Sequence, residues 1–150
     1  LKYANQLNKK VYLFGAKKEV SLKMKEIINK KYPNIELVGC KDGYIENKED
    51  VFKDIKKKRP DIILVALGIP LQEELIYKHY DEFTSGIFIG VGGSFDVISG
   101  IKKRAPKFLI NLNLEWLYRI FKEPKRIKKF YQNNIKFHII ASNIEQLENN

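Results

Sequence analysis

The segment GVGGSFD at residues 90–96 is the strongest candidate for chemistry in this sequence. Glycines tolerate positive φ angles and let backbone amides approach a ligand, so such a turn can hold a phosphate. It is neither a dinucleotide-binding G-x-G-x-x-G, because Phe95 takes the last glycine's place, nor a Walker loop. A plain strand-to-helix turn capped by Asp96 remains the alternative. The candidate binding residues are Gly90, Gly92, Gly93, Ser94 and Asp96.

A second candidate segment is GIPLQE at residues 68–73, where Gly68 and Pro70 precede two polar side chains. Gln72 offers both a donor and an acceptor, which suits sugar hydroxyls or an amide. Glu73 could act as an acid, a base or a hydroxyl acceptor, or it could only complement a helix dipole. Pro70 stands where a helix can begin.

Two further segments offer an aromatic ring and cations. Tyr44 follows Asp42-Gly43 and could stack on a base or sugar, although a plain turn explains the same residues. Arg104 ends a run of three cations and could bind a diphosphate through a bidentate contact, although a solvated basic loop explains the same residues. His79 and His138 have no neighbouring ligand set, so neither is assigned to a metal. Cys40 has no paired base in the sequence and is expected to pack as a small apolar residue.

The elements that must position these residues form an alternating pattern. Apolar runs at 11–14, 35–38, 61–67 and 86–91 predict strands, and residues 19–31, 49–58 and 72–80 have helical spacing. The run DIILVAL is continuously apolar, which is typical of a parallel strand. The sequence therefore predicts an α/β fold, a parallel Rossmann-like sheet flanked by helices, with ligands at the carboxyl ends of the strands. Gly15 follows the first strand.

The C-terminal part differs in composition from the rest. Residues 107–122 and 125–137 have helical spacing on either side of Pro124. Residues 115–137 hold seven basic and two acidic side chains, half of the chain's net charge of +10. The predicted division is an α/β core at 1–114 and a basic amphipathic helical appendage with a tail at 115–150. The appendage either lies on a membrane surface or packs on its own core with a solvated basic face.

The overall composition restricts the possible partners. The net charge of +10 over 150 residues favours anionic partners: nucleic acid, phosphate-bearing substrates or an anionic membrane. A single cysteine excludes an internal disulfide, and no apolar run reaches the roughly 18–20 residues that span a bilayer. The chain starts at Leu1 and its only methionine is Met24, so a fragment of a longer protein is expected.

Together, the ordered motifs resemble the WecG/TagA/CpsF glycosyltransferases, family 26. The resemblance covers about residues 11–137 and implies transfer of N-acetylmannosamine, or a related amino sugar, from a UDP donor. The implied acceptor is N-acetylglucosamine-diphospho-undecaprenol, with inversion and without a metal or other cofactor. It further implies a cytoplasmic protein, peripheral on the inner face of the cell membrane, in surface polysaccharide synthesis of the teichoic acid linkage type. The motifs are Phe14-Gly15, Asp42-Gly43-Tyr44, Pro60-Asp61, Gly68-x-Pro70-x-Gln72-Glu73, residues 90–96, Gly100, Arg104-Ala105-Pro106, residues 114–119 and Glu123-Pro124-x-Arg126.

The same resemblance implies roles for individual residues. Gln72 falls at the family's active-site glutamine, and Arg119 and Arg126 fall where appendage arginines reach the diphosphate. Lys129 replaces a third arginine, which keeps the charge but loses the bidentate fork. The family's asparagine-containing segment and its aspartate general base would both lie before Leu1.

Two other classes of function stay open at this point. A basic α/β nucleic-acid-binding module fits the charge, although no recognised nucleic-acid motif occurs and nucleic acid is not the expected partner. An inactive sugar-nucleotide-binding fragment fits a chain that lacks the base. A homo-oligomer is possible.

Overall fold

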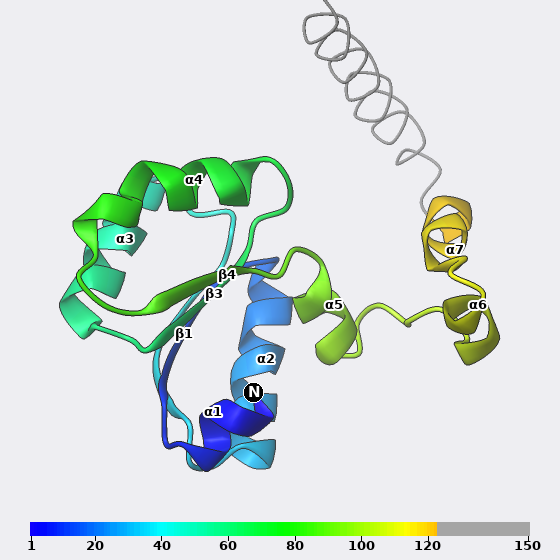
Figure 1. Ribbon diagram of the computed structural model, residues 1–150, viewed down its shortest axis with the longest axis horizontal. Coiled ribbons are helices and arrows are strands. Elements are labelled where there is room, and N and C mark those ends of the chain that lie inside the picture. Colours follow the sequence, from blue (N-terminus) through cyan, green and yellow to red (C-terminus); the bar gives the residue numbers. More distant parts are fainter. Residues whose placement is uncertain (123–150) are drawn as a thin grey trace, which may run out of the picture. The chain divides into compact units, whose positions relative to one another are not determined.

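A computed structural model describes residues 1–122 of the protein (Figure 1). Within them, one sheet of four parallel strands has the order β2-β1-β3-β4. The predicted α/β fold with a parallel sheet and flanking helices is confirmed. The strands are β1 (Lys10–Gly15), β2 (Glu36–Lys41), β3 (Ile62–Ala66) and β4 (Ile87–Gly90).

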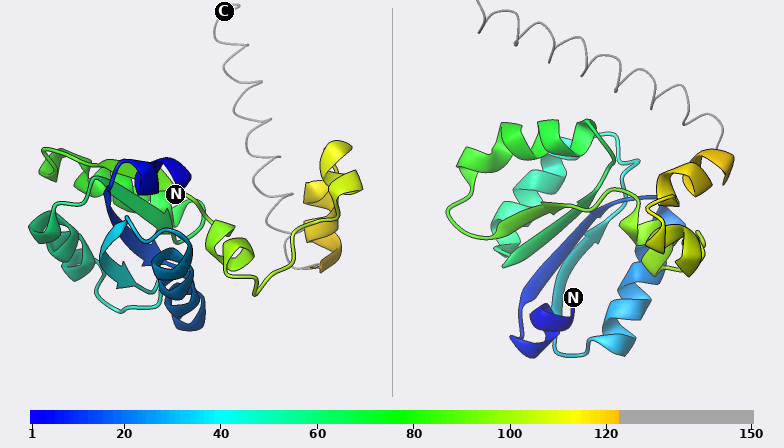
Figure 2. Two further views of the ribbon diagram at one scale, coloured as in Figure 1. Left: turned by 90° about the horizontal axis from the view of Figure 1, so that it is seen from below. Right: turned by 45° about the vertical axis from the view of Figure 1, so that its right-hand side comes forward.

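Helices cover both faces of this sheet, with α2 on one face and α3 and α4 on the other (Figures 1 and 2). The helix α2 ends two residues before Pro33, and α3 starts where the Asn47 side chain accepts a hydrogen bond from the Glu49 amide. The helices are α1 (Lys2–Gln6), α2 (Lys18–Lys31), α3 (Lys48–Lys58), α4 (Leu71–His79), the 3-10 helix η1 (Tyr80–Glu82), α5 (Ser94–Ile98), α6 (Lys107–Asn111) and α7 (Glu115–Lys122).

The central strand β1 divides the core into two layers through its period of two. Val11 and Leu13 pack against the buried face of α2, and Phe95 from α5 belongs to the same cluster. The next residues along the strand, Tyr12 and Phe14, pack on the opposite side against α3. All four side chains of the apolar run at 11–14 are fully buried, so this strand contributes to the core on both faces of the sheet.

The strand β2 extends further than predicted. The sequence pattern ends this strand at Gly39, whereas the structure continues it to Lys41. Gly39 pairs with Tyr12, and a Cβ atom on Gly39 would lie 2.1 Å from the Tyr12 ring. Glycine is required there by close packing inside a strand and does not mark the strand's end.

The chain forms two compact units, and the second one begins at Arg104. The predicted continuous helix at 107–122 is wrong, because two helices, α6 and α7, occupy it. Asn113 between them has a φ of 57°, a left-handed conformation that ends a helix. The predicted helix at 125–137 lies outside the described residues, and the predicted division at 114/115 stays a prediction.

Candidate functional site at the carboxyl edge of the sheet

Backbone hydrogen bonds join the loops that follow β1, β2 and β3. The Ala16 amide donates to the Ala66 carbonyl at 2.8 Å, and the Gly43 amide donates to the Ala16 carbonyl at 2.8 Å. Gly15 has a φ of +125°, and a Cβ atom there would lie 2.4 Å from the Ala66 backbone. The predicted binding residue Gly15 therefore brings two strand ends into close approach.

The side chain of Gln72 joins the loops that follow β3 and β4. Its Oε1 atom accepts from the Gly68 amide at 3.3 Å and from the Gly92 amide at 3.2 Å. Gln72 lies in the first turn of α4 and is only 3% exposed. Three predicted site residues, Gly68, Gln72 and Gly92, therefore meet around one buried amide.

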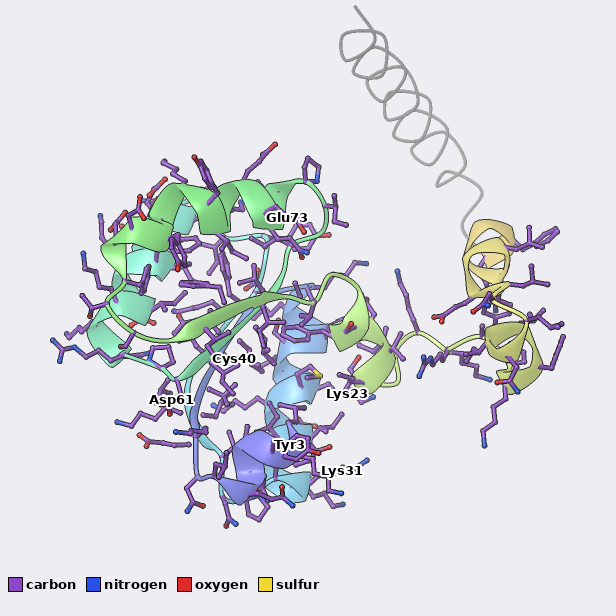
Figure 3. All side chains as sticks on the ribbon, in the orientation of Figure 1. Tyr3, Lys23, Lys31, Cys40, Asp61 and Glu73 are labelled. Atoms are coloured by element: carbon purple, nitrogen blue, oxygen red, sulfur yellow. The ribbon has the colours of Figure 1, made fainter. Side chains whose placement is uncertain are left out.

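The Gln72 amide also contacts two other predicted site residues. Its Nε2 atom donates to Glu73 Oε1 at 2.7 Å. A Cβ atom on Gly90 would lie 2.7 Å from the same nitrogen, so only glycine leaves room for the amide. Glu73 itself is exposed at the start of α4, toward the opposite end of the sheet from Asp61 (Figure 3).

The two glycine loops present open backbone on their outer side. Gly68 has a φ of +80° and Gly92 a φ of +46°, and a Cβ atom on either would meet nothing within 4 Å. Their amides already donate to Gln72, so these two groups are not directed at a ligand. The glycines therefore offer a ligand close approach to the backbone, and the charged contacts must come from side chains.

The loop after β4 differs from the capped turn that the sequence allowed as an alternative. Gly93, not Asp96, holds the cap position of α5, and Asp96 lies within the first turn of that helix. The Ser94 amide donates to the Val91 carbonyl at 3.0 Å. On the other loop, Pro70 is the cap residue that precedes α4.

The aromatic candidate Tyr44 lies on the loop after β2. Its ring is 74% exposed, while its amide donates to Asp42 Oδ1 at 2.9 Å in an Asx turn. The side chain is thus accessible to a planar ligand, and the loop is tied to the end of β1 through Gly43.

A cavity of about 420 Å³ lies elsewhere, between α2 and the edge strand β2. Its lining includes Lys18, Lys25, Cys40 and Asp42, but not Gly68, Gln72 or Gly92. Partial burial raises the pKa of the Cys40 thiol, which donates to the Ser21 carbonyl at 3.4 Å. Cys40 thus has the surroundings of a packing residue, in line with its interpretation from the sequence.

The cationic candidates belong to the second unit. Arg104 lies 3.9 Å from the Glu115 carboxylate, and its side chain is 62% exposed. Arg119 lies within α7. Arg126, Lys129 and His138 lie outside the described residues, so their predicted roles are untested.

Loops joined at the carboxyl edge of a parallel sheet are typical of α/β proteins, which commonly bind their ligands at that edge. The chain belongs to the glycosyl transferase WecG/TagA/CpsF family, whose sequence profile matches residues 1–148. The predicted resemblance is therefore confirmed.

Several bacterial relatives share one name, N-acetylglucosaminyldiphosphoundecaprenol N-acetyl-beta-D-mannosaminyltransferase. The protein of Bacillus subtilis (strain 168) is 45% identical over 126 residues, which cover 84% of this chain and 49% of the relative. That of Staphylococcus aureus (strain MW2) is 42% identical over 142 residues, which cover 94% of this chain and 56% of the relative. The chain thus spans about half the length of these curated relatives, and they do not favour the nucleic-acid-binding alternative.

Within residues 1–122, no helix has the length and apolarity needed to cross a bilayer. In the same range, no group of three or more His, Cys, Asp and Glu side chains is arranged to hold a metal ion.

Proposed function

We propose that this chain forms the sugar-nucleotide-binding part of an enzyme that transfers N-acetylmannosamine from a UDP donor. The proposed acceptor is N-acetylglucosamine-diphospho-undecaprenol, and the transfer inverts the anomeric carbon. The observation that carries the proposal is the convergence of Gly68, Gln72, Gly90 and Gly92 at one edge of the sheet, in a chain of this family. The names of the relatives support the acceptor and the sugar.

The proposed roles follow from the chemistry of each side chain. The open glycine loops admit the donor, and the exposed Tyr44 ring stacks on its base. Cations neutralise the negative charge that develops on the leaving diphosphate. The sugar passes through an oxocarbenium-like state, and a carboxylate deprotonates the acceptor hydroxyl. The cations are Arg104, Arg119, Arg126 and Lys129; no residue of this chain is assigned as the base.

We also propose that the second unit contacts the inner face of the cell membrane, where a lipid-linked acceptor resides. Large apolar side chains are exposed on it beside cations: Phe108 is 62%, Leu112 63% and Phe121 78% exposed. Each cation near an anionic leaflet adds about 1 kcal/mol of attraction. Sedimentation with vesicles of 30% anionic lipid tests this contact: binding that falls with salt and in Phe121→Ser is expected, and no binding at low salt would contradict it.

A transfer assay tests the proposed function. The chain, alone and joined to the remaining half found in its relatives, is mixed with UDP-N-acetylmannosamine and a short-chain lipid-diphosphate acceptor. The expected result is donor binding by the chain and formation of a disaccharide lipid by the longer protein. A longer protein that is folded, binds no UDP-sugar and forms no product would refute the proposal.

A further inference from the structure

The first turn of α4 contains three consecutive polar side chains with different surroundings. Gln72 is 3% exposed and engaged on both sides of its amide, whereas Glu73 and Glu74 are exposed. Glu73 differs from Glu74 in one respect that matters for binding. Its Oε1 atom is held at 2.7 Å by Gln72 Nε2 and would lie 3.6 Å from a Cβ atom on Gly90, so its carboxylate has a fixed position beside the end of β4.

The bonds of Gln72 leave little capacity for a ligand. An amide oxygen has two lone pairs, and Gln72 Oε1 accepts from two backbone amides. The side chain is almost inaccessible, and its nitrogen packs over Gly90. Substitution of Gln72 would therefore act through Glu73 and through the two glycine loops.

We propose that Gln72 is a positioning residue and that Glu73 is the side chain that recognises the amino sugar of the donor. This inference rests on the proposed function and deepens it. The Glu73 carboxylate only accepts hydrogen bonds, so it suits a ring hydroxyl or the acetamido N–H. A carboxylate repels a diphosphate, so the contact lies on the sugar side of the donor. A carboxylate held in advance by Gln72 loses less conformational entropy when the sugar binds.

Calorimetric titration with UDP and with UDP-N-acetylmannosamine separates sugar recognition from nucleotide recognition. In Glu73→Gln, binding of the UDP-sugar should weaken about tenfold because a charge-assisted hydrogen bond is lost, while binding of UDP stays unchanged. The matched control is Glu74→Gln, which removes the same charge from the same helical turn and should change neither affinity.

A reciprocal exchange tests the positioning role of Gln72. Gln72→Glu alone sets two carboxylates against each other and should weaken binding of both ligands. The double variant Gln72→Glu/Glu73→Gln restores the hydrogen bond in the reverse direction and keeps an acceptor for both glycine amides. It should recover UDP binding to within about twofold of wild type, yet retain the tenfold loss for the UDP-sugar.

The outcomes distinguish the two proposals. Wild-type protein that binds neither ligand overturns the proposed function and this inference with it. Wild-type protein that prefers the UDP-sugar, with the same preference in Glu73→Gln, leaves the proposed function standing and refutes the role of Glu73. Full recovery of UDP-sugar binding in the double variant shows that Glu73 is only structural and also refutes it. Since Glu73 is exposed, the single variant is expected to fold, which circular dichroism checks.

Discussion

The two ends of α4 each bury one polar side chain, but their surroundings differ. At the first turn, Gln72 lies between two glycine loops whose outer sides are open. At the last turn, His79 is 4% exposed and stacks on the Phe52 ring, with the ring centroids 4.1 Å apart. One end of the helix therefore holds loops in place beside free space, and the other closes a layer of the core.

Charged groups surround His79 without opening a site there. Its Nδ1 atom lies 2.8 Å from Glu82, and its Nε2 atom makes an ion-pair contact of 2.9 Å with Glu49 that is not an aligned hydrogen bond. A hydrogen bond from Lys78 lowers the pKa of Glu49, and His79 lowers the pKa of Glu82. These charges compensate one another, and aromatic rings fill the remaining space: Phe14, Phe83 and Phe88 pack around Phe52.

The comparison shows that a buried polar side chain can either position loops beside an open surface or complete the packing of the core. Both polar atoms of the Gln72 side chain are hydrogen-bonded, whereas His79 is hydrogen-bonded at Nδ1 only and its Nε2 atom has a charged neighbour without an aligned bond. Only the glycine loops joined by Gln72 leave backbone accessible beside an exposed, fixed carboxylate. We expect changes at His79 to alter stability alone, and changes near Gln72 to alter binding more than stability.

The largest expected effect comes from the closed end. Phe52→Ala removes a ring that is 2% exposed and should lower the free energy of unfolding by about 3–5 kcal/mol. Urea unfolding measures the loss. Affinity for UDP-N-acetylmannosamine, measured on the folded fraction, should not change; a tenfold loss of affinity would mean that the two ends of α4 are not separate in function.

A smaller loss of stability is expected at the open end. Gly90→Ala places a methyl group 2.7 Å from Gln72 Nε2 and displaces the amide without changing its chemistry. Overpacking of this kind costs about 1–3 kcal/mol of stability. Donor affinity should fall as well, because both glycine loops lose their shared acceptor. Gly100→Ala meets nothing within 4 Å but strains a backbone with a φ of +75°, so it controls for a loss of stability without a clash at Gln72 and should leave donor affinity unchanged. Unchanged donor binding in Gly90→Ala would contradict the account.

The charges at the closed end predict a dependence on pH. The pKa of Glu82 is lowered from its usual value of 4.5, so the carboxylate stabilises the fold above that value and the contribution is lost as pH falls through the lowered pKa. The difference in urea midpoint between wild type and Glu82→Gln should shrink as the pH falls below 4.5. A difference that persists at pH 3 would show that the ionised pair is not its cause.

The smallest effect on stability is expected for Tyr44→Ala. The ring is 74% exposed, so the free energy of unfolding should change by less than about 0.5 kcal/mol. If the ring stacks on the base, affinity for UDP should fall about fivefold while discrimination between UDP and the UDP-sugar is unchanged. Tyr77→Ala, at a side chain that is 87% exposed, is the matched control.

Local patterns predict much of this fold, because its elements depend on contacts near in sequence. The four apolar runs become the four strands, with ends that shift by one to three residues, and Pro33 and Pro60 follow helix ends as predicted. The carboxyl-edge position of the glycine loops also follows, since parallel strands place their following loops together.

Other features depend on which strands become neighbours. The bond between Gln72 and Gly92 spans twenty residues and exists because β3 and β4 are adjacent. One partner of His79, Glu82, is three residues away, but α3 brings two more, Phe52 and Glu49, to it from more distant positions in the sequence. The sequence pattern ends the second strand at Gly39, because the Tyr12 ring that packs over this glycine cannot be inferred from either segment alone.

Amide NMR spectra of the chain, titrated with UDP-N-acetylmannosamine, test the central claim most directly. The claim predicts that the largest shifts fall on Gly68, Gln72, Glu73, Gly92 and Ser94, while Phe52 and His79 are unchanged. Shifts confined to Lys25, Cys40 and the other residues of the cavity along β2, with none at the glycine loops, would contradict it.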